Sequence, residues 1–332
     1  MKGSLRRVVF VMLFGIVLYF AYAVWRGLGA IGLSLSHFSW LAFVAACALA
    51  FSNYVLRFFK WEFYLARLDI RGVGKVDSFL TFLSGFVLTV TPGKVGEVFK
   101  SLVLEGTHDV PVAKTAPIVV AERVTDLIGV ITLIVLGSLG FSGGLVWAGV
   151  GAALVSLLVI VISSRSLSLG IIGRIERMPG KIGALGPKLH QAYESLAVML
   201  KPRNLVVPTL LSVLAWSFEC MALWVILQGF GETTSVPLCV FFYATSTLAG
   251  ALVPVPGGLG ITEGALQEQM TAIGHVDKGT STAAMMLVRF ATLWFAVLVG
   301  FIALSVLKRR YPRLLAGARV LEAPRDVVSS PH

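Results

Sequence analysis

The sequence predicts an all-α polytopic membrane protein with about six full spans and two helical hairpins broken by proline and glycine. Of its 332 residues, 57% are hydrophobic and 14% are charged, whereas soluble domains have about 25% charged residues. Several uncharged runs are long enough to cross a bilayer, and two Pro-Gly breaks recur in similar surroundings. This pattern excludes an ordinary soluble enzyme, a disordered chain and a fibrous repeat.

The first two spans come before any break. A span needs about 20 mostly apolar residues, because each residue adds about 1.5 Å of helix across a hydrocarbon core about 30 Å thick. Val8 to Trp25 is an uncharged run behind a basic N-terminus. We expect it to be a retained anchor helix within an N-terminal segment, residues 1–38. The next run, Trp40 to Leu56, opens the first repeat, residues 39–162.

The middle of the first repeat is a broken hairpin, residues 78–104. Its uncharged run ends in Thr91-Pro92-Gly93-Lys94-Val95-Gly96-Glu97. Proline removes a backbone donor and glycine loosens a helix, so we expect a helix-break-helix here. Residues 127–164 are also uncharged and are too long for one span. We therefore expect the chain to fold back near Gly140 and Gly143-Gly144.

The second repeat covers residues 205–307 and shows the same order. A span at 205–227 precedes a hairpin at 236–273, which breaks at Pro254-Val255-Pro256-Gly257-Gly258-Leu259-Gly260, and a span follows at 282–307. Between the repeats, residues 163–204 fit basic amphipathic helices on the anionic inner leaflet. A solvated linker explains them equally well. Residues 308–332 are a short basic tail.

The basic residues behind the net charge of +11 indicate how the chain is oriented in the membrane. With the N-terminus inside, Arg26 and Lys278 fall outside, Arg123 and Arg289 fall within spans, and the rest of the 28 basic residues lie inside. This asymmetry predicts an inner-membrane protein with both termini in the cytosol. It gives no reason to expect a nucleic-acid partner.

Two equal spacings link the halves. Glu97 lies 26 residues before Arg123, and Glu263 lies 26 residues before Arg289. Each unit is a span, a broken hairpin with Glu just past the break, and a span with Arg near its start. Because the first unit runs outside to inside and the second inside to outside, we predict an inverted repeat, which is typical of secondary transporters.

Ionisable side chains at membrane depth are costly, so they pair or face a wet cavity. We therefore expect a head-group site built from Lys94, Glu97, Glu122, Arg123, Asp126, Glu219, Glu263 and Arg289, with backbone breaks at Pro92, Gly93, Gly96, Pro256, Gly257, Gly258 and Gly260. The competing interpretation is that these charges are packing pairs, such as Arg123 with Asp126 or Glu97, and Arg289 with Glu263.

The breaks also suggest how an anion would bind. A half-helix that starts after Gly93 or Gly258 points free N–H groups into the interior, which suits a phosphate. Leu88 and Val95 stand where a nucleotide P-loop needs Gly and Ser or Thr, so that motif is excluded. Three scattered cysteines and five dispersed histidines form no ligand cluster. We predict no cofactor and no metal.

The motif around Pro92, the run Ala121-Glu122-Arg123-Val124-x-Asp126 and the run Pro256-Gly257-Gly258-Leu259-Gly260-x-x-Glu263-Gly264 together resemble the flippase-like family of the lysylphosphatidylglycerol synthase transmembrane region. The resemblance covers roughly residues 8–306. Some members fuse this region to an aminoacyltransferase domain, which this sequence lacks after Leu307. The resemblance implies a bacterial inner-membrane protein that moves a lipid or glycolipid between leaflets.

Three hypotheses follow. The leading one is a lipid translocase for a phospholipid, glycolipid or polyisoprenoid-phosphate head group. The second is a membrane accessory protein that recruits an envelope glycosyltransferase or a lipid-synthesis enzyme. A membrane-embedded enzyme ranks last, because we find no nucleophile–base arrangement. The lipid, the direction and coupling of transport and the oligomeric state stay open, as does whether the hairpins are re-entrant.

Overall fold

A computed structural model describes residues 34–91, 97–141, 196–253 and 255–312, with a few single positions between 146 and 156. The described part is helical throughout and contains no strand, so the all-helical prediction is confirmed there. Its elements are α2 (Trp40–Arg67), α3 (Lys75–Ser84), η1 (Gly85–Leu88), α4 (Phe99–His108), α5 (Val112–Ser138), α9 (Pro202–Gly229), α10 (Val236–Leu252), η4 (Pro256–Gly258), α11 (Ile261–Ala272), α12 (Lys278–Arg289), the π-helical turn η5 (Phe290–Trp294) and α13 (Phe295–Arg310).

Three helices of the described part are long and apolar enough to cross a membrane. They are Trp40–Arg67, Arg203–Gly229 and Lys278–Arg310, of 28, 27 and 33 residues. The last of these joins α12, the π-helical turn and α13. At about 1.5 Å per residue each exceeds the thickness of a hydrocarbon core.

Several expected segments fall outside the described residues. They are the anchor at Val8–Trp25, the turn at Gly143-Gly144 and most of the span after it, most of the basic connector, and most of the C-terminal tail. The first break, Pro92 to Gly96, is also outside.

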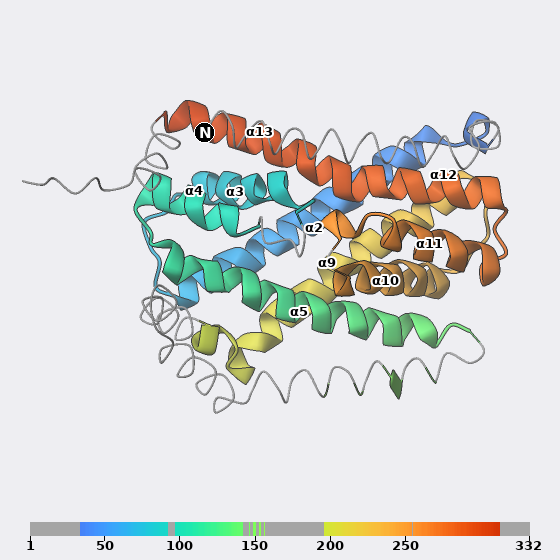
Figure 1. Cartoon of the computed structure of the whole chain (residues 1–332), viewed down its shortest axis with the longest axis horizontal. Coiled ribbons are helices and arrows are strands. Elements are labelled where there is room, and N and C mark those ends of the chain that lie inside the picture. The colour runs from blue at the N-terminus through green and yellow to red at the C-terminus, as the bar shows by residue number, and fades with distance from the viewer. Residues whose placement is uncertain are drawn as a thin grey trace, which may run out of the picture.

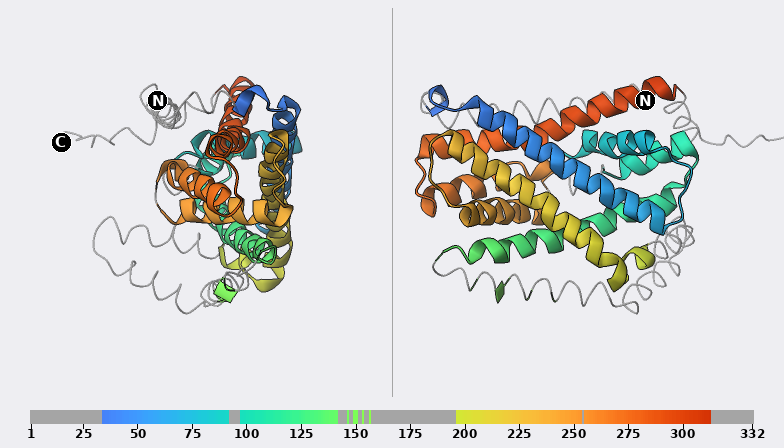
Figure 2. Two further views of the ribbon diagram at one scale, coloured as in Figure 1. Left: turned by 90° about the vertical axis from the view of Figure 1, so that its right-hand side faces the viewer. Right: turned by 180° about the vertical axis from the view of Figure 1, so that it is seen from behind.

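Helices α2 and α9 pack against each other through the middle of the molecule (Figures 1 and 2). The short helices α3 and α4 lie at one end, and α10 and α11 lie at the opposite end (Figure 1). Helix α13 covers α3, and α5 packs on both α9 and α10. The two pairs of short helices therefore flank the central crossing of α2 and α9.

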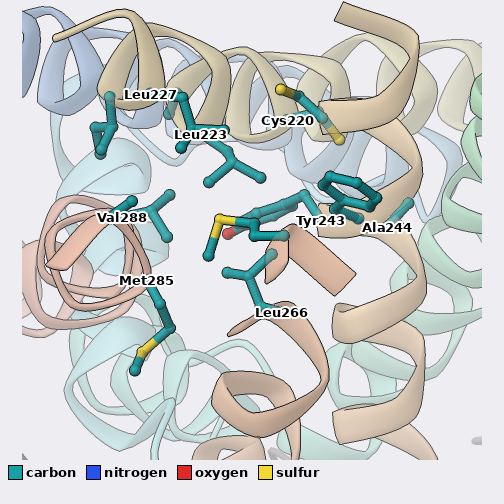
Figure 3. Packing of buried hydrophobic residues seen from close by; sticks show 14 of the residues in the cluster. Cys220, Leu223, Leu227, Tyr243, Ala244, Leu266, Met285 and Val288 are labelled. Carbon is teal, nitrogen blue, oxygen red and sulfur yellow. The ribbon is translucent and has the colours of Figure 1, made fainter. Parts of the chain in front are cut away.

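The largest apolar core lies around α9 and the second group of short helices. Leu223 and Leu227 from α9 meet Tyr243 from α10, Leu266 from α11 and Met285 from α12 (Figure 3). Leu223, Leu266 and Met285 are fully buried. Close packing of this kind holds the second hairpin rigidly against α9, so residues carried by the hairpin occupy fixed positions.

The outer surface is apolar along the long helices. Leu41 of α2, Leu210 of α9 and Leu252 of α10 are well exposed, at 77%, 64% and 73%. Extended exposed apolar surface in a helical protein marks contact with a partner or a membrane. Together with the three long apolar helices, it defines a membrane protein.

Helix α2 corrects the predicted charge distribution. It continues to Arg67, well past the predicted end of the span at Leu56. The charge count placed Arg57, Lys60 and Lys100 on the inner surface, but their exposures are 7%, 0% and 2%. The count was wrong for these three because a basic residue beyond an apolar run was taken to lie in a loop. Here α2 and α4 turn these side chains into the protein.

Candidate functional site

The second backbone break is held by one arginine and one glutamate. Arg289, the last residue of α12, donates from Nε to Glu263 Oε1 at 2.6 Å and from Nη2 to the Gly257 carbonyl at 2.9 Å. Glu263, in the first turn of α11, accepts from the Gly260 N–H at 2.7 Å. One ion pair thus holds the break between α10 and α11 against the C-terminal end of α12, within the long helix Lys278–Arg310.

Glycine is required at this break for two reasons. Gly257, Gly258 and Gly260 have φ of 62°, 67° and 86°, a region that side chains with Cβ rarely adopt. A Cβ on Gly250 of α10 would also lie 2.0 Å from Thr262 Oγ1 of α11. The break therefore forms here because these residues permit both the left-handed turns and the close approach of the two helices.

The Glu263 carboxylate lies at the start of this half-helix. It takes the N–H of Gly260, the residue that precedes α11. An anion at this helix start would therefore meet a negative side chain.

The first hairpin has a matching ion pair. Glu97, in the turn that precedes α4, pairs with Arg123 of α5. Glu97 is buried, whereas the Arg123 side chain is 29% exposed. Both pairs join residues 26 apart, as the equal spacing suggested. They are two of the pairs that the packing interpretation named.

A further cation reaches the first pair from α2. Arg57 lies 3.8 Å from Glu97 and 3.4 Å from Asp126 of α5. Asp126 is also paired with Lys60 of α2 and accepts from Ser212 Oγ of α9 at 2.9 Å. Three helices therefore meet in a buried charge cluster.

Lys60 is fully satisfied inside that cluster. Besides Asp126, its Nζ donates to Ser212 Oγ at 2.8 Å and lies 3.4 Å from Thr125 Oγ1. A buried ammonium is tolerated only with such a complete set of acceptors.

Glu122 belongs to a separate buried pair. Its Oε2 lies 2.5 Å from Lys100 Nζ, and the ammonium also lies over the rings of Trp61 and Phe82, at 4.6 and 5.2 Å from their centroids. Glu122 is fully buried and lines neither of the two cavities described below. This pair fixes α4 to α2, α3 and α5.

The first cavity lies where α2, α9, α10 and the π-helical turn converge. It has a volume of about 60 Å³ and is partly open, and four charged residues line it: Arg57, Glu97, Glu219 and Arg289. Glu219 of α9 accepts from Tyr243 Oη at 2.7 Å. The aromatic lining consists of Tyr54, Phe86, Trp216 and Tyr243. The charges from both halves thus meet around one buried space.

The second cavity, of about 130 Å³, adjoins the first, because both are lined by Thr247, Arg289 and Leu293. Its other lining residues include Arg123, Thr91 beside the first break, and Gly257 and Gly258 of the second break. Thr91, which precedes the first break in the sequence, and the second break therefore border the same cavity. Leu293 belongs to the π-helical turn, a feature often found at functional sites.

The structure distributes the predicted site residues as follows. It brings Glu97, Arg123, Glu219 and Arg289 to the two cavities, and it places Glu263 and Asp126 directly behind them as ion-pair partners. Lys94 lies outside the described residues.

Sequence reasoning missed Arg57 and Lys60 as members of the site. One signal could have found them: with Asn53 and Trp61 they recur at three- and four-residue spacing, which places them on one flank of a helix.

The fold and the site together define an α-helical membrane protein with charged residues lining two adjoining cavities. The chain belongs to the family described as the lysylphosphatidylglycerol synthase TM region, which it matches over residues 8–300. The match is to the transmembrane region alone.

Similar proteins are named UPF0104 membrane proteins. One from Methanocaldococcus jannaschii, MJ1595, is 22% identical over 270 residues, covering 75% of this chain and 80% of the relative. One from Methanothermobacter thermautotrophicus is 21% identical over 327 residues, covering 90% and 93%. PH1989 from Pyrococcus horikoshii is 23% identical over 280 residues, covering 76% and 82%. Their names state a membrane protein and no activity.

Proposed function

We propose that this chain is a lipid translocase, which moves the head group of a phospholipid, glycolipid or polyisoprenoid phosphate through the two adjoining cavities. The hydrocarbon tails stay in the bilayer while the head group passes. One observation carries the proposal: the ion pairs Glu97–Arg123 and Glu263–Arg289 stand at the two hairpins, and a member of each pair lines each of two adjoining cavities.

Packing alone accounts less well for this arrangement. Each ionisable group at membrane depth costs about 2.5 to 3.5 kcal/mol on insertion scales. Lys100 with Glu122 shows what a purely structural pair looks like here, because both residues are buried away from the cavities. Arg123 and Arg289, in contrast, keep a face on the cavities although each has a carboxylate partner.

The order of the elements supports an inverted repeat. Each half has a long helix, two short helices around a break and a second long helix, and the short pairs lie at opposite ends of the molecule (Figure 1). Helices α3 and α4 have 10 residues each, about 15 Å or half a hydrocarbon core. This length favours a re-entrant hairpin in the first half. Such repeats with broken helices are the architecture of many secondary transporters.

The placement in the cell belongs to the same proposal. We assign about six full spans, an orientation with both termini in the cytosol, and a location in the cytoplasmic membrane. The domains keep the predicted boundaries at residues 38, 162, 204 and 307. The lipid is the only partner that the mechanism needs, and no catalytic step is assigned to the chain.

A leaflet-resolved assay tests the proposal. The purified chain is reconstituted into vesicles that contain a head-group-labelled phospholipid, and the label exposed outside is followed with a membrane-impermeant quencher. Arg123→Ala and Arg289→Ala should each slow lipid movement at least tenfold, on the order of 1.4 kcal/mol in the barrier. Arg310→Ala is the control, because Arg310 pairs with Asp77 and lines neither cavity.

Unchanged movement in both cavity variants would contradict the charged-cavity mechanism. A wild-type chain that moves none of the three lipid classes would instead favour the accessory role. In that case, deletion of the recruited glycosyltransferase or lipid enzyme should reproduce the phenotype of deleting this chain.

A further inference from the structure

Glu219 is a buried carboxylate to which the proposed function gives no role. It lies on α9, is 8% exposed and lines the first cavity together with Arg57, Glu97 and Arg289. Its Oε2 accepts a hydrogen bond from Tyr243 Oη of α10 at 2.7 Å. Because the cavity is partly open, water and protons can reach this carboxylate.

The hydrogen bond from Tyr243 allows Glu219 to be charged or neutral. A tyrosine hydroxyl both donates and accepts, so it can donate to a carboxylate or accept from a protonated carboxyl. Guanidinium and ammonium groups only donate, so protonation of a carboxylate that they hold breaks an ion pair. Three other carboxylates at the centre of the molecule are held in this way, as the pairs Glu97–Arg123, Glu263–Arg289 and Asp126–Lys60.

Two carboxylates, Glu97 and Glu219, line a cavity of only about 60 Å³. When two carboxylates share a site, each disfavours the ionisation of the other, so one of them takes up a proton more readily. Glu97 is held in its ionised form by its pair with Arg123 and by Arg57, which lies 3.8 Å away. Glu219 is therefore the carboxylate of this cavity at which a proton is less costly.

The charges that line the cavity balance when Glu219 is ionised, because the lining has two arginines and two glutamates. No described residue of α5 is part of this lining. Arginine keeps its proton, so one proton on Glu219 leaves the lining with a net charge of +1. The ionisable groups around Glu219 are Tyr54 and Arg57 of α2, Tyr243 of α10, Arg289 of α12, Glu97 before α4, and the neighbouring Cys220.

We propose that Glu219 is a proton-binding site that couples the movement of an anionic head group to the movement of a proton. This inference rests on the proposed function and specifies how transport is driven. The proton comes from water on the side to which the cavity is open and binds a carboxyl oxygen of Glu219. The net charge of +1 then favours entry of one negative charge, and by linkage the anion equally favours the proton. Proton and anion cross together.

A pH gradient across reconstituted vesicles tests the coupling. The probe is phosphatidylethanolamine labelled on its amine, which leaves the single negative charge of the phosphodiester. Its steady-state distribution between the leaflets is measured with a membrane-impermeant quencher. One proton per lipid makes transport electroneutral, so a gradient of about one pH unit should sustain up to about a tenfold excess of label in the leaflet facing the less acidic side. Vesicles without the protein give the baseline.

Glu219→Gln and Glu268→Gln form a matched pair of variants. The first keeps the size of the side chain and an acceptor for Tyr243 but binds no proton, so lipid should move without any excess in either leaflet. Glu268 of α11 is exposed and lines neither cavity, so its variant should retain the wild-type excess. A wild-type excess in Glu219→Gln, or no excess in a wild type that moves lipid, would overturn the inference.

Infrared spectroscopy of the purified full-length chain in detergent gives a readout that needs no lipid movement. Glutamate ordinarily titrates near pH 4.3, so exposed carboxylates are largely ionised at about pH 6. At that pH the wild type and Glu268→Gln should show the C=O band of a protonated carboxylic acid, which Glu219→Gln should lack. If Glu219→Gln does not fold, Glu219→Asp should shift the frequency of this band. A wild-type spectrum without the band would overturn the inference.

The proton site and the proposed function can fail separately. If the wild type moves lipid but sustains no excess under a pH gradient, the proton site is wrong while translocation stands. If the wild type moves no lipid but shows an infrared band that Glu219→Gln lacks, the proton site stands and the translocase proposal falls.

Discussion

The two hairpins differ in how the charges of their glutamate–arginine pairs are satisfied. In the second half, Arg289, Glu263, the Gly257 carbonyl and the Gly260 N–H satisfy one another, so the break is closed on itself. In the first half, Glu97 is shared by Arg123 and the more distant Arg57, and Arg123 remains 29% exposed. We therefore expect the second break to be rigid. In the first half, we expect the ion pairs to change partners more easily.

The largest expected effect compares the two glutamates. Glu263→Ala leaves the buried Arg289 without its carboxylate, so we expect a loss of about 3–5 kcal/mol in unfolding free energy. Glu97→Ala should cost clearly less, because Arg57 keeps Asp126 and Arg123 reaches an open face. Thermal and denaturant unfolding in detergent measure both. Equal losses would show that the two halves are equally rigid and would end the distinction between them.

An intermediate effect tests the close packing of the second hairpin. In Gly250→Ala the new Cβ would lie 2.0 Å from Thr262 Oγ1. Because α10 and α11 are already packed against α9, we expect a loss of about 1–3 kcal/mol from overpacking. Gly264→Ala on α11 is the control, since nothing lies within 4 Å of its added Cβ. If Gly250→Ala unfolds at the same temperature as this control, the second hairpin is looser than the comparison requires.

The smallest expected effect on stability concerns the N-termini of α5 and α12, the helices that follow the two hairpins. The start of α12 is capped from its own sequence: Asp277 accepts from the N–H groups of Gly279 and Thr280 at 2.7 and 3.0 Å. The start of α5 is capped from α4, because Glu105 Oε1 accepts from the Val112 N–H at 3.2 Å. Asp277→Ala should cost about 1 kcal/mol, measured as a lower unfolding temperature at neutral pH.

The Asp277 cap should also depend on pH. Hydrogen bonds from the Thr280 side chain and from the N–H groups of Gly279 and Thr280 hold the pKa of Asp277 below its usual value. A lowered folded-state pKa adds stability above the unfolded pKa and loses it as pH falls through the folded value. The difference between wild type and Asp277→Ala should therefore shrink below about pH 4. A difference that stays constant into strong acid would show that the carboxylate charge plays no part in the cap.

Much of the fold could be predicted because it depends on local rules. The helical breaks follow from proline and glycine, and the structure has them at Pro256, Gly257, Gly258 and Gly260. The packing interpretation of the charges named Glu97–Arg123, as one of two options for Arg123, and Glu263–Arg289, and both pairs exist. Each glutamate lies just past its break, and each arginine lies on the following long helix, where its partner is within reach.

The rest of the site could not be predicted in the same way. The interpretation of the charges as packing pairs and the interpretation as a cavity were alternatives, whereas the structure contains both. Glu122 and Asp126 are one turn apart on α5, yet one joins Lys100 and the other joins Lys60 and Arg57. Which partner each acid receives depends on which helices pack against α5, and sequence spacing does not contain that information.

The sequence by itself determined the membrane class, the place where the second hairpin breaks and the need for the buried charges to pair. These properties follow from hydropathy, from the backbone limits of proline and glycine, and from the cost of an unpaired charge in hydrocarbon. Only the tertiary structure decided that Arg57, Lys60 and Lys100 lie inside the protein, and that Arg123 lines the same cavity as the second break. The reason is that α2 and α4 must be placed against their neighbours before the direction of a side chain is defined.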